Sequence, residues 1–122
     1  MPRFIIHKHC RGDAGPVHWD LMLEVGSVLA TWQVPNSPLD WDRTEILCRR
    51  LFDHRLVYLT YEGPIGNGRG EVALVEAGTY ERMKEVEGIW TVVLSGRTMQ
   101  GVLTLRQQEG AEWTLQFEGE ST

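Results

Sequence analysis

Apolar and polar residues alternate along most of this chain with a period of two. That period places alternate side chains on one face of a β-strand, and no window of a dozen residues sustains the period of an amphipathic helix. The pattern predicts strands over residues 3–9, 17–24, 27–34, 46–51, 56–61, 70–76, 79–85, 88–95, 100–107 and 112–118. Turn-forming residues separate these strands at 25–26, 66–68, 77–78, 87–88 and 109–110.

Many short strands separated by turns predict a mainly β fold, which we expect to be a small closed antiparallel β-barrel with one or two short helical turns. The irregular segment 35–44 is the expected place for a helical turn or for a loop over one mouth of the barrel. The 122 residues can bury one continuous core, so residues 1–122 are expected to form a single domain. A closed barrel of this size needs no partner to fold, and we therefore expect a monomer.

Five tryptophans are many for a chain of this length. Trp32, Trp90 and Trp113 alternate with polar neighbours, as core residues on strands do, and are interpreted as packing residues. Packing is also the preferred interpretation of Trp19 and Trp41, with stacking on a nucleic-acid base as the alternative.

The formal net charge of -5 argues against a protein that coats nucleic acid through charge alone, because such binding rests on many Lys or Arg contacts to phosphates. Local charge still matters, since Arg43, Arg49, Arg50 and Arg55 fall close together around His54. The planar guanidinium group suits phosphate oxygens. A solvated, charged strand face is the equally weighted alternative.

The start of the chain has neither the basic segment nor the long apolar run of a signal sequence, and no window reaches the length of a membrane span. We therefore expect a cytoplasmic protein that does not associate with membranes. Cys10 and Cys48 match no zinc-binding or redox spacing, so both are expected to be free thiols.

The most informative chemistry lies in His9 and in the triplet His18-Trp19-Asp20. On a strand, His18 and Asp20 share one face while Trp19 points the other way. If the Gly- and Asp-containing segment 10–16 is a hairpin loop, the two strands pair and His9 lies beside His18 and Asp20. Two imidazoles and one carboxylate form a ligand set for Mn, Fe or Zn that leaves positions open for water or substrate.

Two alternatives stay open for these residues. A His-x-Asp pair on a strand can be a hydrogen-bonded surface pair that holds no metal. By the same alternation His7 shares the face of His9, where it is either a fourth ligand or a solvated bystander.

The order of several motifs resembles the 3′-phosphoesterase domain of bacterial and archaeal DNA ligase D and its stand-alone relatives. The similarity is specific and covers nearly the whole chain. In chain order the motifs are RFIIHKH (3–9), HWDLMLE (18–24), WQVP (32–35), Asp53-His54 with Tyr58, YEGPI (61–65), EAGTY (76–80), LSG (94–96), GVLTL (101–105) and Trp113.

The resemblance implies a compact β-barrel with a Mn-dependent site in a groove. Members of the family remove a terminal ribonucleoside and then the 3′ phosphate from the 3′ end of a DNA primer strand, in support of end joining. Their metal ligands match His9, His18 and Asp20. The histidine and tyrosine with which they contact the scissile phosphate match His54 and Tyr58.

Three positions depart from the family pattern. Met22 and, in an ungapped alignment, Ile46 stand where the family has phosphate-binding arginines, and Phe52 stands where it has a glutamate. We expect Arg49 and Arg50 to bind the substrate, and one of them or Arg43 to supply one of the two missing guanidinium groups, whereas a shift of register cannot explain Met22, which lies in an unshifted motif. Loss of both guanidinium groups without replacement would cost on the order of several kcal/mol at the transition state.

The leading hypothesis is a Mn-dependent DNA 3′-end-healing phosphoesterase that acts in DNA repair and end joining. Its partners would be DNA 3′ ends and a ligase or polymerase of end joining. The alternative is a catalytically weak or inactive metal-binding barrel that binds DNA ends or a repair partner, and Met22 and Phe52 motivate it. A cupin-like metalloenzyme for a small organic substrate uses similar ligands, but the spacing from His54 to Tyr58 and the long match disfavour it.

Overall fold

The computed structural model describes residues 1–11, 16–66 and 69–120 of the chain, and most of them lie in strands. The strands are β1 (Arg3–Cys10), β2 (Val17–Val25), β3 (Val28–Val34), β4 (Glu45–Arg55), β5 (Gly63–Pro64), β6 (Glu71–Val86), β7 (Ile89–Gly96), β8 (Gln100–Glu109) and β9 (Glu112–Gly119). Two short 3-10 turns, η1 (Pro38–Asp40) and η2 (Leu56–Leu59), are the only helical elements in these described ranges. The prediction of a mainly β fold is confirmed.

The sheet closes on itself. Its antiparallel strands follow the order β1-β2-β3-β4-β9-β8-β7-β6, and β6 pairs again with β1, so that hydrogen bonds run in a ring through eight strands. The short β5 adds to β6 outside this ring. Closure removes most unpaired edges, as the turn-rich strand pattern predicts.

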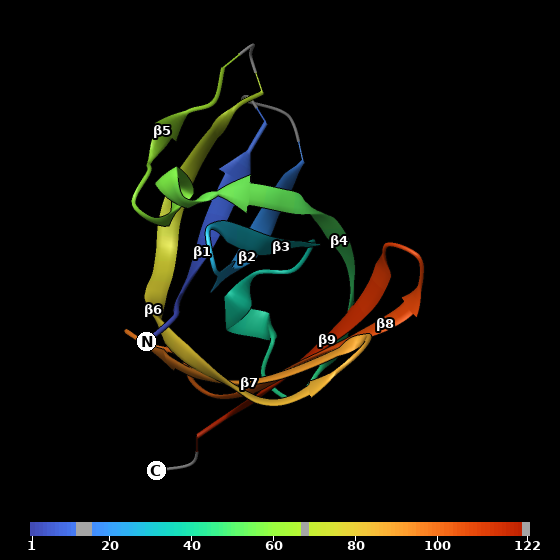
Figure 1. The fold of residues 1–122 in the computed structure, drawn as a ribbon. Helices are drawn as coiled ribbons and strands as arrows, with labels where there is room; N and C mark the ends of the chain where they lie inside the picture. The colour runs from blue at the N-terminus through green and yellow to red at the C-terminus, as the bar shows by residue number, and fades with distance from the viewer. Residues whose placement is uncertain (12–15, 67–68, 121–122) are drawn as a thin grey trace.

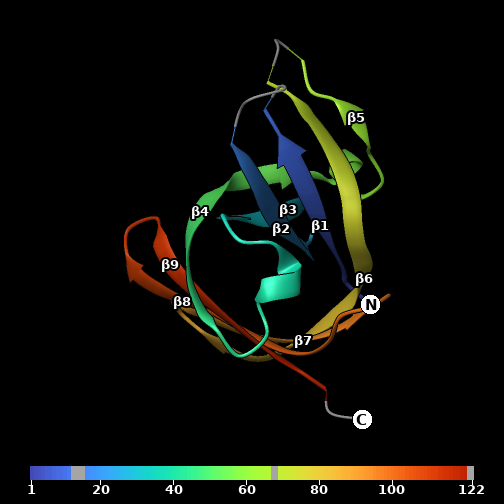
Figure 2. The same ribbon diagram turned by 180° about the vertical axis from the view of Figure 1, so that it is seen from behind.

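Two long strands connect the two halves of the ring. The first part of β4 pairs with β9 and its second part with β3, while β6 pairs first with β1 and then with β7. Figures 1 and 2 show the result from opposite sides: β7, β8 and β9 form one half, and β1, β2 and β3 form the other. The segment with η1 lies between the halves, and Trp41, which follows it, is fully buried in the core.

The predicted turn at Ala77-Gly78 is wrong, because β6 runs without interruption through it. Gly78 lies within this strand and does not turn the chain. A Cβ atom there would lie 2.1 Å from the carbonyl oxygen of Ser95 on β7, so only glycine permits this close approach of the two strands. The sequence pattern alone cannot distinguish a glycine that turns from one that makes room.

The predicted strand over 56–61 is also wrong. Residues Leu56–Leu59 form the turn η2, and β4 instead continues through His54 to Arg55. Leu59 packs under this turn against Ile5 and Met22, so tertiary packing rather than the alternating pattern decides the local structure.

The strands β1 and β2 are buried on both faces. Phe4 on β1 and Leu21 on β2 face the main core inside the ring, whereas Ile5 and Met22 face a second, smaller apolar cluster outside it. The end of β4 and η2 cover that outer face. Burial on both faces explains why these strands carry continuous apolar runs instead of strict alternation.

The packing role expected of the tryptophans is confirmed. Trp32, Trp41 and Trp113 are buried, and Trp19 and Trp90 pack half-buried against the same core. The indole nitrogen of Trp41 donates a hydrogen bond of 2.8 Å to the carbonyl oxygen of Asn36.

Both cysteines are free thiols, as predicted, and burial raises the pKa of Cys48 to about 12. The part of the chain that the structure describes holds no helix of the length and hydropathy that crossing a membrane requires. Two predicted turn regions, 12–15 within the first hairpin loop and 67–68 within 66–68, lie outside the described residues.

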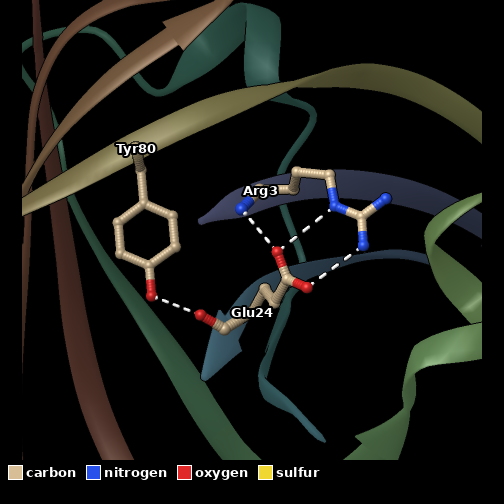
Figure 3. Close-up of polar contacts among 3 residues, drawn as sticks. All are labelled: Arg3, Glu24 and Tyr80. Atoms are coloured by element: carbon tan, nitrogen blue, oxygen red, sulfur yellow. Dashed lines mark hydrogen bonds and ion pairs between the residues drawn. The ribbon is translucent and has the colours of Figure 1, made fainter. Parts of the chain in front are cut away.

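A polar cluster joins the first two strands to β6 (Figure 3). Glu24 accepts hydrogen bonds from the backbone nitrogen of Arg3 at 2.9 Å and from its guanidinium at 3.2 and 3.1 Å. The hydroxyl of Tyr80 on β6 donates to the carbonyl oxygen of Glu24 at 2.7 Å. These bonds reach from β6 to β2 across β1, and the hydrogen bonds from Arg3 hold the pKa of Glu24 below its ordinary value.

Glu76 is a buried carboxylate that organises the turn between β7 and β8. It accepts five hydrogen bonds, from the backbone nitrogens of Ala77, Arg97, Thr98 and Met99 and from the hydroxyl of Thr98. Burial alone would raise its pKa, but these hydrogen bonds outweigh burial and the pKa of Glu76 is lowered.

We expect Glu76→Gln to reduce the free energy of unfolding by about 2–4 kcal/mol at neutral pH, because an amide nitrogen cannot accept the bonds that a carboxylate oxygen accepts. The folded-state pKa is depressed, so this contribution is present above the ordinary carboxyl pKa and is lost as the pH falls through the folded value. Urea unfolding at neutral pH and at about pH 3 should show the gap between wild type and variant shrinking in acid. Replacement of the exposed Glu81 by Gln is the control, and a gap that does not depend on pH would contradict this role.

Candidate metal centre

The pairing of β1 with β2 brings the predicted ligands together. In the antiparallel register His9 lies opposite His18, and His7 lies opposite Asp20. Residues directly opposite in such a pair share a face, so all four side chains lie on the outer face of the ring, which the end of β4 covers. This is the arrangement that the hairpin interpretation predicts.

The three predicted ligands form a compact cluster. Asp20 Oδ2 lies 3.8 Å from His9 Nδ1, and Asp20 Oδ1 lies 3.4 Å from His18 Nε2. One potential ligand atom from each residue falls within 4.8 Å of the others. Asp20 is buried, with 4% of its surface exposed, which differs from the hydrogen-bonded surface pair of the alternative interpretation.

The hydrogen bonds around the cluster fix which atoms face its centre. His9 Nε2 lies 2.8 Å from the carbonyl oxygen of Arg69, which can only accept, so Nε2 carries a proton and Nδ1 is the ring nitrogen that faces Asp20. Asp20 Oδ1 is buried and accepts no hydrogen bond from any described residue. Two imidazole nitrogens and a buried carboxylate oxygen without a hydrogen-bond partner thus face one point, and this donor set fits a divalent metal ion.

His7 is not a member of the cluster. It is fully buried, and its Nε2 lies 3.0 Å from the carbonyl oxygen of Tyr61. Burial lowers the pKa of His7, and this effect outweighs the bond to Tyr61, so the imidazole is neutral at pH 7. It is therefore not the solvated bystander of the second alternative.

The cluster opens into a cavity of about 430 Å³ that His54 and Tyr58 also line. The sequence pattern predicts that these two residues lie on one strand. This prediction is wrong, because Tyr58 lies on η2. The turn nevertheless places its ring 5.9 Å from that of His54, centroid to centroid. His54 Nδ1 lies 2.9 Å from the carbonyl oxygen of Phe52, which leaves Nε2 free.

The structure separates the two arginines that were expected to bind the substrate. Arg50 points inward, where its guanidinium lies 4.4 Å from the ring centroid of Trp32 and 3.6 Å from a carboxylate oxygen of Asp53. It lines a different cavity. Arg49 is exposed and lines a neighbouring hollow that shares His18 and Gln33 with the cluster's cavity.

Three other arginines line the cavity itself: Arg11, Arg55 and Arg69. Arg43 lies elsewhere, beside Asp42 at 3.9 Å. Sequence reasoning grouped Arg55 with His54 but missed Arg11 and Arg69. Residues 7, 9 and 11 alternate along β1 and just beyond its end, so the sequence pattern could have predicted that Arg11 lies on the same face as His7 and His9. Arg69, in contrast, reaches His9 only through the folding of the sheet.

The three departures from the family pattern have different environments. Met22 is 1% exposed and packs with the outer apolar cluster at the cavity wall. Ile46 is buried in the main core. Phe52 is 78% exposed at the cavity, so only this departure presents a large side chain to solvent.

Comparison with known proteins identifies relatives of this chain. Residues 7–110 match the family model described as the DNA Ligase D 3′-phosphoesterase domain. The multifunctional non-homologous end joining DNA repair protein LigD of Mycobacterium tuberculosis is 32% identical over 117 residues, which cover 90% of this chain and 15% of that protein. The LigD proteins of Mycolicibacterium smegmatis and Pseudomonas aeruginosa are each 28% identical over 125 residues, covering 91% and 93% of this chain but 16% and 14% of those proteins. The chain thus spans only a small part of the length of these relatives.

The cluster geometry predicts the effect of removing one imidazole. His18→Ala is expected to weaken binding of a divalent transition-metal ion such as Mn²⁺ by at least about tenfold, since even outer-sphere changes cost that much. Isothermal titration calorimetry of the apoprotein with Mn²⁺ measures the change. His54→Ala, which removes the same side chain from the same cavity, is the matched control; equal losses in both variants would refute the assignment of ligands.

Proposed function

Because this chain belongs to the DNA ligase D 3′-phosphoesterase domain family, we propose that it is a metal-dependent hydrolase that removes the phosphate from 3′ ends of DNA. One observation carries the proposal. A cluster of two imidazoles and a carboxylate opens into the same cavity as a second histidine and a tyrosine. That combination supplies a cation site and proton-donating groups at one place, as phosphoester hydrolysis requires.

We propose that His9 Nδ1, His18 Nε2 and a carboxylate oxygen of Asp20 hold one Mn²⁺ ion. A bound ion of this kind polarises a phosphoryl oxygen and lowers the pKa of a bound water. The ligand set also accepts Fe, Co or Zn, so supply in the cell decides which metal is held. The bond from His9 to the carbonyl of Arg69 keeps the ring in the orientation that this role needs.

His54 is proposed to move a proton at the leaving oxygen. Its Nδ1 is held by the carbonyl of Phe52, so Nε2 is the atom available to the substrate. In its cationic form Nε2 donates a proton to the oxygen that departs from phosphorus. The hydroxyl of Tyr58 is proposed to donate a hydrogen bond that orients a phosphate oxygen.

The arginines at the cavity provide positive charge for the phosphate. Met22 supplies none, being an apolar side chain at the wall. Arg11, Arg55 and Arg69 line the same space and are proposed to bind the phosphate oxygens or the neighbouring DNA backbone. This assignment replaces Arg50, whose guanidinium faces the tryptophans inside the ring.

The cellular role of this chain is also a proposal, and it rests on the relatives. The mycobacterial protein is named for DNA repair by non-homologous end joining, and this chain matches 15% of it. We propose that the chain acts on DNA ends in the same process, as a monomer, alongside a ligase or polymerase. Removal of a 3′ ribonucleoside before the phosphate is a further proposed step.

A second candidate function is a metal-binding module that holds DNA ends without hydrolysing them. The burial of Met22 in an apolar cluster favours it, because no guanidinium takes its place on that strand. The two candidates differ in one respect, the release of phosphate.

A labelled primer-template with a 3′ phosphate distinguishes them. With Mn²⁺ we expect conversion to a 3′ hydroxyl with release of inorganic phosphate, and no conversion with EDTA or in His18→Ala. Gel mobility and a phosphate assay follow the product. Wild-type protein that holds the metal and binds this DNA but leaves it intact would instead support the binding module.

The proposed role of His54 predicts a second, separable effect. His54→Ala should lower the single-turnover rate by about 10²–10⁴-fold, the usual contribution of general acid catalysis. Tyr58→Phe removes one hydrogen bond and should lower it by about tenfold. Affinity for Mn²⁺ should stay as in wild type in both variants; a His54→Ala enzyme that turns over at the wild-type rate would rule out this role.

A further inference from the structure

Phe52 lies in an irregular part of β4. In the pairing of β3 with β4, Thr31 lies opposite Leu51 and Leu29 lies opposite His54, with a shift of register between them. Two residues of β4, Phe52 and Asp53, therefore face the single position of Ala30. This extra residue is a β-bulge, a device that redirects side chains next to functional sites.

The bulge places Phe52 on the cavity side of the sheet. Strict alternation would send neighbouring residues of β4 to opposite faces, but every residue from Leu51 to Arg55 lines the cavity. The ring of Phe52 stacks on the imidazole of His54 with 5.0 Å between centroids and 12° between planes. His54 thus covers one face of the phenyl ring.

The other face of Phe52 is open to solvent. The residue is 78% exposed, an unusual state for a large aromatic side chain, and its ring lies parallel to the imidazole of His54. Leu39 and Leu47 are also exposed, but scattered aliphatic side chains are ordinary on protein surfaces. Phe52 differs because it is flat, oriented and placed at the cavity that holds the metal cluster.

The surroundings of Phe52 match the chemistry of a nucleotide. Arg11, Arg55 and Arg69 line the same cavity and offer guanidinium groups to phosphate oxygens. An exposed aromatic ring offers a surface on which any base can stack, because every base has a π-face. An aromatic platform and cationic groups around one cavity favour a nucleotide over an apolar peptide.

We infer that the open face of Phe52 stacks on the base of the terminal nucleotide whose 3′ phosphate enters the cavity. The inference rests on the proposed function and extends it, because it assigns the residue that holds the end of the strand. Stacking of this kind tolerates every base, so the site recognises the presence of a terminal base and not its identity.

The test compares two labelled primer-templates that both carry a 3′ phosphate. One ends in a normal nucleotide and the other in an abasic tetrahydrofuran residue. Fluorescence anisotropy in EDTA measures their Kd values without turnover. Wild-type protein should bind the normal end about 5- to 150-fold more tightly than the abasic end.

Substitutions at Phe52 connect this preference to the ring. Phe52→Trp should retain it, whereas Phe52→Leu, which keeps an apolar side chain against His54 but has no flat face, should bind both DNAs equally. Leu39→Ala, at another exposed apolar position, should behave as wild type. Thermal melts check that every variant is folded.

The outcomes separate this inference from the proposed function. Equal binding of both DNAs by wild type, or a preference retained in Phe52→Leu, overturns the stacking role. A preference that follows an abasic residue placed several nucleotides inside the strand also overturns it. Phosphate release with Mn²⁺ is measured independently: release without base preference refutes only the stacking, and base preference without release refutes only the hydrolase.

Discussion

The antiparallel register between β1 and β2 is the constraint on which the rest of this structure depends. It places His9 opposite His18 and His7 opposite Asp20, so one pairing determines both the cluster of His9, His18 and Asp20 and its buried neighbour His7. The same alternation sends Phe4 to the core inside the ring. A slip of one residue would exchange the two faces and bury the imidazoles among apolar side chains.

Two long strands, β4 and β6, complete the site on the outer face of β1 and β2. Because β4 and β6 each pair with strands of both halves, the second part of β4 and the turn η2 can cover the outer face of β1 and β2. That cover forms one wall of the cavity and brings His54 and Tyr58 to it.

The sequence predicted the mainly β fold, its closure, most strand positions and the three clustered residues. These features could be predicted because period-two alternation and hairpins depend on residues that are close together in the sequence. It could not predict that Gly78 makes room for Ser95 within one long strand, since that requires knowledge of β7. Nor could it place Arg50 against Trp32 or Arg69 against His9, because both contacts depend on strand partners distant in sequence. The bulge at Phe52 escaped prediction for the same reason: it is a property of pairing with β3.

The central claim is that His9, His18 and Asp20 hold one metal ion, with His9 binding through Nδ1 because Arg69 occupies Nε2. Anomalous X-ray diffraction from crystals grown with Mn²⁺ tests it most directly. We expect one strong peak within coordination distance of His9 Nδ1, His18 Nε2 and a carboxylate oxygen of Asp20. No peak there at saturating metal, or a His9 ring turned to bind through Nε2, would contradict it.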